Sequence, residues 1–114
     1  MHTVAQLNSF NRHAAEAGMS EGEIERLVLF VAENPMAGVE IAGTGGCRKL
    51  RIAGRGKGKS GGYRVIAFFS GAKMPVYLLT IFSKGEKANL SPAERNGLHD
   101  ITRAIVKEHR SRIA

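Results

Sequence analysis

Two helix-start signatures of the same kind constrain the fold of this chain more than any other feature. Both have the form of a capping box: Ser20-Glu21-Gly22-Glu23 and Ser91-Pro92-Ala93-Glu94. In such a box the serine hydroxyl accepts a hydrogen bond from the backbone amide of the glutamate, and the glutamate carboxylate accepts one from the backbone amide of the serine. Apolar residues at helical spacing follow each box, and Asn34-Pro35 ends the first helix. A further short helix is predicted over residues 10–17, and a short strand over residues 3–7. Helices therefore flank the middle of the chain on both sides.

Between the two boxes the hydrophobic period changes to two. Strands are predicted over residues 49–53, 63–69 and 76–82, with glycine-rich segments between them. Three strands joined by short loops make an antiparallel meander, which needs helices to bury one face. With 114 residues the chain has room for one domain, residues 1–114. The predicted fold class is α+β: a small antiparallel sheet of three to four strands packed against two N-terminal helices, with a C-terminal helix.

Composition excludes several classes of protein. The longest fully apolar run, residues 27–32, has six residues, far short of the roughly 20 that a membrane helix needs. The first residues lack the pattern of a secretory signal, and the single cysteine, Cys47, allows neither an internal disulfide nor a cysteine zinc cluster. The four histidines show no zinc spacing, so no metal and no cofactor is expected. We expect a protein of the reducing cytoplasm.

The charge of the chain is segregated along the sequence. The formal net charge is +7, yet residues 1–40 hold six acids and two bases, whereas residues 41–85 hold nine bases and no acid. Such a stretch cannot neutralise itself locally, so its partner is expected to be anionic, and a phosphate backbone is the commonest such partner. The alternative is a basic surface of solvated side chains without a partner.

Strand alternation predicts where these cations point. If Leu50 faces the core, Lys49 and Arg51 face the opposite side of the sheet, and Arg64 on the next strand can join them. The lysine-rich loop between these strands is expected to overhang this open face. Most aromatic residues fall in strand runs typical of a core, and Tyr63 is the best candidate for an exposed ring.

The loop also invites comparison with a nucleotide-binding phosphate loop. Counting back from Gly58-Lys59-Ser60, the first glycine of that motif would stand at position 53, which is alanine. A strand rather than a helix follows, so the phosphates would lack a helix N-terminus. A nucleotide-hydrolysing enzyme is therefore disfavoured, and the glycines suit a hairpin tip.

Three sequence blocks, in order, resemble the HigB-type branch of the RelE toxin family over about residues 20–98. They are residues 43–51 (GTGGCRKLR), residues 56–66 (GKGKSGGYRVI) and residues 78–91 (LLTIFSKGEKANLS). The resemblance implies a compact sheet-plus-helices fold and the toxin half of a type II toxin–antitoxin pair. It also implies a ribosome-dependent mRNA endoribonuclease of the cytoplasm. The implied partners are the ribosome, mRNA and a cognate antitoxin encoded by an adjacent gene, with operator DNA reached only through the antitoxin and no membrane.

The resemblance implies cleavage by the 2′-hydroxyl of the RNA itself, with cations assisting. Lys49 is the candidate base, because Arg51 and Arg64 beside it disfavour its charged form, and Arg64 would stabilise the phosphorane. Lys84 or Lys87 would assist charge stabilisation or protonate the leaving group. The candidate catalytic residues are thus Lys49, Arg51, Arg64, Lys84 and Lys87, and the candidate RNA-binding residues are Arg48, Arg55, Lys57, Lys59 and Tyr63.

Two positions depart from the family pattern. Ala67 and Phe82 stand where relatives often carry tyrosine. If either missing hydroxyl served proton transfer or RNA stacking, activity would be reduced. The alternative function is therefore a non-catalytic basic module, a degenerate toxin that binds nucleic acid or the ribosome. The antitoxin partner is expected to carry an acidic or amphipathic segment and a DNA-binding domain.

Overall fold

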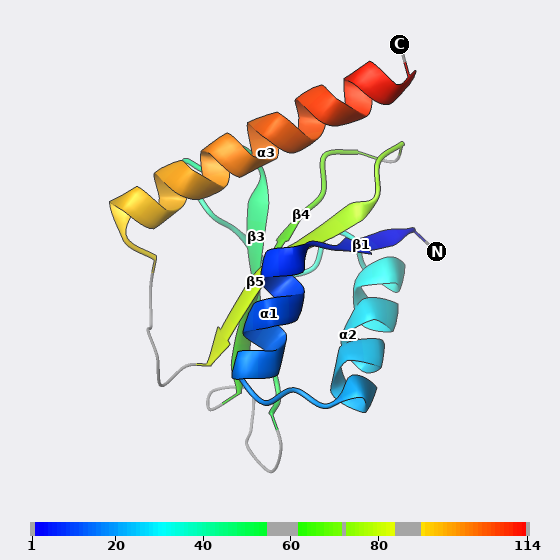
Figure 1. Cartoon of the computed structure of the whole chain (residues 1–114), viewed down its shortest axis with the longest axis vertical. Helices are drawn as coiled ribbons and strands as arrows, with labels where there is room; N and C mark the ends of the chain where they lie inside the picture. Colours follow the sequence, from blue (N-terminus) through cyan, green and yellow to red (C-terminus); the bar gives the residue numbers. More distant parts are fainter. Residues whose placement is uncertain (1, 55–61, 72, 84–89, 114) are drawn as a thin grey trace.

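The computed structural model describes residues 2–54, 62–71, 73–83 and 90–113, with the side chains of residues 112 and 113 excepted. A sheet of five strands separates two helices on one face from a third helix on the other (Figure 1). The elements are β1 (Val4–Gln6), α1 (Asn8–Glu16), α2 (Glu21–Glu33), β2 (Val39–Glu40), β3 (Cys47–Ile52), β4 (Tyr63–Phe68), β5 (Val76–Ser83) and α3 (Pro92–Ile113). The predicted α+β class is confirmed.

Both predicted capping boxes form. The Ser20 hydroxyl accepts the amide of Glu23 at 3.1 Å, and the Glu23 carboxylate accepts the amide of Ser20 at 3.0 Å. The second box pairs Ser91 with Glu94 in the same reciprocal way, at 2.8 and 3.1 Å. Each box satisfies two amides that the first turn of a helix leaves without partners, so α2 and α3 begin where the sequence places them.

The strand order is β1-β5-β4-β3-β2. The meander β3-β4-β5 is antiparallel as predicted, whereas β1 pairs parallel to β5, so the sheet is mixed. The strand β2 was not predicted from the sequence, because two residues are too few to show a period of two. This strand adds an outer edge beside β3, with Val39 opposite Lys49.

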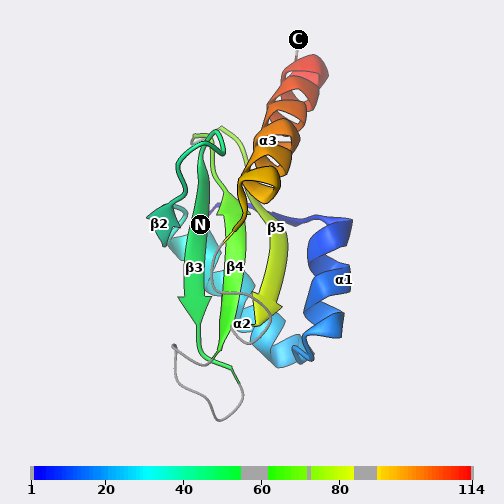
Figure 2. The same cartoon turned by 90° about the vertical axis from the view of Figure 1, so that its left-hand side faces the viewer.

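Helices pack on both faces of the sheet rather than on one. On the first face, Phe10 and Ala14 of α1 and Leu27 and Val31 of α2 pack against β4 and β5 in one buried cluster. On the second face, Leu98 of α3 joins a smaller cluster with residues of β3, β4 and β5. Figure 2 views the sheet face-on, with α3 crossing in front of its upper part and α2 behind it. The second face is therefore only partly open.

A buried turn before β3 fixes the position of α3. The Thr44 side chain is fully buried, and its hydroxyl donates to the Ile41 carbonyl and accepts the Cys47 amide. The Thr102 hydroxyl of α3 donates to the Thr44 carbonyl at 2.9 Å. Gly45 has φ +78°, and a Cβ there would lie 2.8 Å from the Thr102 Oγ1. This close approach requires glycine and holds α3 over one end of the sheet.

Candidate nucleic-acid interface

Three of the predicted site residues lie on one face of the sheet. Arg51 of β3 stands directly opposite Arg64 of β4, and Lys49 stands opposite Ile66. Because side chains alternate along a strand, Lys49, Arg51 and Arg64 share the face that α3 partly covers. We call these three residues the basic face. The nuclease interpretation requires these three residues to lie on one surface, and they do.

The helix α3 divides this side of the sheet into an apolar end and a basic end. Cys47, Ile66 and Phe68 are buried in the cluster that includes Leu98 of α3. Lys49 and Arg51 lie further along β3, beyond that cluster, and are half-buried and exposed, respectively. In Figure 2 this end of β3 and β4 faces the viewer below α3. Among the described residues, α3 does not cover this end of β3, where Arg51 is exposed.

The cross-strand arginine pair is unfavourable for the fold itself. Like charges directly opposite one another on neighbouring strands repel, and a buried charge is costly to desolvate. Arg64 is 5% exposed, and its Nη1 donates to the Tyr63 carbonyl across a long 3.5 Å contact. Two arginines at directly paired positions of neighbouring strands can both contact one anion, such as a phosphate group.

Phe82 is the neighbour of the basic face on the next strand. It lies opposite Arg64 and is 5% exposed in the cluster beneath α3. A tyrosine at position 82 would therefore reach the basic face, so this departure from the family pattern bears on the site. Ala67 lies opposite Arg48 and packs in the core with α1 and α2, on the other face. A hydroxyl at position 67 would point away from the basic face.

The expectation that Tyr63 is exposed is wrong. Tyr63 is 8% exposed and belongs to the core cluster beneath α1 and α2. It neighbours Arg64 in β4, so alternation turns its ring to the opposite face. The predicted strand 63–69 included Tyr63, but the alternation that places Arg64 on the basic face was not extended to Tyr63. We do not retain Tyr63 as an RNA-stacking residue.

Arg48 also lies away from the basic face. It alternates with Lys49, and its Nε and Nη2 donate to the carbonyls of Ala37 and Gly38 at 3.3 and 3.0 Å. These bonds hold the turn that leads into β2. The observed role of Arg48 is thus to stabilise the edge of the sheet, and we do not carry it into the RNA-binding set. The other predicted cations, Arg55, Lys57, Lys59, Lys84 and Lys87, lie outside the described residues.

Cys47 is not placed for nucleophilic chemistry. Its side chain is fully buried under α3. Burial raises the pKa of the Cys47 thiol to about 11, and a hydrogen bond with Thr44 offsets part of that rise. At neutral pH the thiol is therefore protonated and inert. Among the residues that the structure describes, no group of three or more histidine, cysteine or acidic side chains could hold a metal ion.

Two hollows that tertiary packing creates were not predicted from the sequence. One, of about 620 Å³, lies where α3 meets the ends of the sheet and includes Arg103, Lys107 and Arg110 in its lining. The other, of about 430 Å³, lies between α1, β5 and the start of α3. Helical spacing alone indicates that the three α3 cations share a face, but nothing local in the sequence places α1 beside β5.

None of the described helices is long and apolar enough to span a membrane.

The structure is that of an α+β domain with cations clustered on one partly covered face of its sheet. Comparison with known families identifies it further. A family model described as the RelE toxin of the RelE/RelB toxin–antitoxin system matches residues 3–114. The chain belongs to this family and is the toxin of a toxin–antitoxin system, with a cognate antitoxin as its partner. Toxins of this family are generally mRNA-cleaving endoribonucleases.

Proposed function

We propose that this toxin cleaves translated mRNA on the ribosome, by attack of a ribose 2′-hydroxyl on the adjacent phosphate. The observation that carries the proposal is the basic face, in which Lys49, Arg51 and Arg64 converge from two neighbouring strands. The guanidinium groups of Arg51 and Arg64 can bind the two non-bridging oxygens of one phosphate group.

The reaction has a balanced sequence of steps. Lys49, acting as base, takes the proton of the 2′-hydroxyl, and the resulting oxygen attacks phosphorus. The arginines stabilise the negative charge that develops on the phosphorane. The bond from phosphorus to the 5′-oxygen then breaks, and that oxygen takes up a proton. The products are a 2′,3′-cyclic phosphate, which can open to a 3′-phosphate, and a 5′-hydroxyl. We propose Lys84 or Lys87 as the donor of the second proton.

The same arrangement supports dependence on the ribosome. The described basic face contains neither histidine nor a carboxylate, which are the usual acid–base pair of a free ribonuclease. Holding the reacting groups in line can supply about 7–11 kcal/mol of a reaction barrier. A message positioned in the ribosome would supply that alignment, and cations beyond Arg51, with Arg55, Lys57 and Lys59 as candidates, would bind RNA phosphates.

Induced expression tests the proposal. Wild-type protein is expected to arrest growth and to cleave translated messages, and Lys49→Ala and Arg51→Ala are expected to relieve both effects. Lys73→Ala is the matched control, because Lys73 is exposed in the segment between β4 and β5, away from the basic face. Circular dichroism of each purified variant establishes that it is folded. Intact messages during growth arrest by the wild type would instead favour the non-catalytic binding module.

A further inference from the structure

A pocket beside the basic face has the wrong chemistry for a phosphate. It lies between α1, β5 and the first turns of α3, with a volume of about 430 Å³. We call it the side pocket. Its polar lining includes Ser9, His13, Thr80, Glu16 and Glu94, and its apolar lining includes Phe82, Leu98 and Ile101. No lysine or arginine of the described chain lines it, and two carboxylates do, so an anionic group would be repelled.

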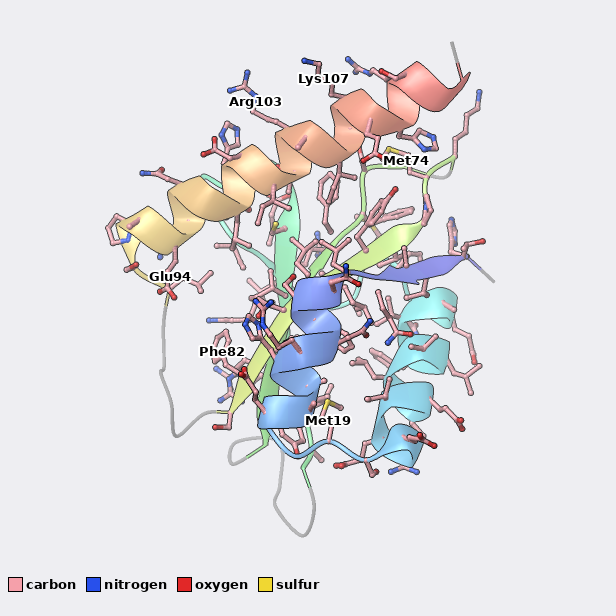
Figure 3. All side chains as sticks on the ribbon, viewed as in Figure 1. Met19, Met74, Phe82, Glu94, Arg103 and Lys107 are labelled. Carbon is pink, nitrogen blue, oxygen red and sulfur yellow. The ribbon has the colours of Figure 1, made fainter. Side chains whose placement is uncertain are left out.

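One residue of the side pocket is paired with a residue of the basic face across neighbouring strands. Phe82, which lines the pocket, is the direct cross-strand partner of Arg64. Neighbouring strands lie about 4.8 Å apart, so the floor of the pocket begins one strand away from the arginine pair. Figure 3 shows Phe82 beside the end of β5, to the left of α1, and Glu94 at the start of α3. A group attached to a phosphate on the basic face could enter the pocket from there.

The polar groups of the side pocket are already positioned by the fold. His13 of α1 lies with its Nδ1 2.6 Å from the Thr80 hydroxyl of β5. This bond occupies Nδ1, so Nε2 is the ring nitrogen that can hydrogen-bond a ligand. The Ser9 hydroxyl donates to the Leu79 carbonyl at 2.6 Å, which ties α1 to the same strand. Hydrogen-bonding groups held in place above an apolar floor can read the edge of a flat ligand.

We propose that the side pocket binds a nucleobase of the message, next to the bond that the toxin cleaves, and that it selects bases carrying an exocyclic amino group. The proposal rests on the proposed function for the position of the phosphate. A nucleobase is neutral, has apolar faces, and presents donors and acceptors along one edge. Carboxylates such as Glu16 accept hydrogen bonds from the amino groups of cytosine, adenine or guanine, whereas uracil has no such group.

Ile101 gives a means of closing the pocket without touching the basic face. Its side chain lines the pocket and is 40% exposed, although it is apolar. Ile101→Trp adds bulk at the pocket wall and should exclude a base. Ala104→Trp is the matched control, because Ala104 is exposed on the same helix and lines neither hollow. Glu16→Gln keeps the size of the side chain and removes its charge, which tests the choice of base rather than the space.

The experiment measures cleavage of messages on purified programmed ribosomes. Otherwise identical messages carry each of the four bases at the two positions flanking the cleaved bond. For wild type and Ala104→Trp we expect one of these positions to favour amino-bearing bases over uracil by about tenfold, the discrimination typical of one good edge contact. Ile101→Trp should lower cleavage of the favoured messages to the uracil level, and Glu16→Gln should reduce the preference at that position.

Each other outcome has a definite meaning. A wild type that cleaves with no preference, or with a preference for uracil, overturns the nucleobase proposal and leaves the proposed function standing. The same holds if Ile101→Trp, folded by circular dichroism, keeps the wild-type preference. If Ile101→Trp does not fold, Glu16→Gln decides the matter alone. A wild type that cleaves no message overturns the proposed function, and the nucleobase proposal with it.

Discussion

The arginine pair of the basic face predicts that the site is maintained at a cost to stability. Arg51 and Arg64 stand directly opposite each other, which brings their Cβ atoms to about 4.5–5.5 Å. Two unit charges about 5 Å apart repel each other by about 0.8 kcal/mol in water and by about 3 kcal/mol at an effective dielectric constant of about 20. Arg51 is exposed, so the lower part of that range applies. Arg51→Gln should therefore stabilise the fold by about 0.5–1 kcal/mol.

Thermal unfolding measures this effect. For a domain of this size, 1 kcal/mol corresponds to about 4 °C, so Arg51→Gln should raise the Tm by about 2–4 °C at low salt. Salt screens the repulsion, so the difference should shrink as sodium chloride rises. Phosphate should raise the Tm of the wild type more than chloride at equal ionic strength, and Arg51→Gln should lose that extra gain. The same variant should lose RNA cleavage.

Arg12→Gln provides the control, because Arg12 is exposed on α1. It should leave both the Tm at low salt and the response to phosphate close to those of the wild type. The reasoning is refuted if Arg51→Gln lowers the Tm, or if it keeps the full stabilisation by phosphate. Either result would mean that Arg51 and Arg64 do not form a joint anion site.

Three further predictions concern the parts that hold the site. The pKa of the Cys47 thiol is about 11 in the native state, against 9.0 for an unperturbed thiol, so above pH 9 the unfolded state loses this proton first. The contribution of the buried thiol to stability is therefore complete below pH 9 and is lost as the pH rises toward 11. Denaturant titrations should show this loss of stability in wild type and not in Cys47→Ala. Gly45→Ala should cost about 1–3 kcal/mol in urea unfolding, more than Gly43→Ala, because both have positive φ but only the first meets α3. Arg48→Ala should cost about 1–2 kcal/mol through its lost carbonyl bonds and leave the cleavage rate per folded molecule unchanged.

Local signals in the sequence predicted most of the elements. Both capping boxes and the meander β3-β4-β5 depend on residues close together in the chain, and both form as predicted. Strand alternation also placed Lys49 and Arg51 on the same face as each other. Tyr63 was incorrectly predicted to be exposed, although the same alternation, counted from Arg64, places it on the face that α1 and α2 cover.

Longer-range arrangements could not be read from local patterns. The register that sets Arg51 opposite Arg64 depends on the length and path of the intervening loop, which alternation does not fix. The crossing of α3 depends on the Thr44–Thr102 hydrogen bond and on the close approach at Gly45, between residues far apart in sequence. The side pocket depends in the same way on His13 meeting Thr80. These contacts decide which part of the basic sheet remains open.

The chemistry of the cleaved ends tests the central claim most directly. Purified toxin is incubated with ribosomes programmed with a labelled message, and the termini of the fragments are identified with polynucleotide kinase and phosphatase. We predict a 5′-hydroxyl on one fragment and a cyclic or 3′-phosphate on the other, with no cleavage by Lys49→Ala and none of the message alone. A 5′-phosphate product, or full cleavage by folded Lys49→Ala, would contradict the account.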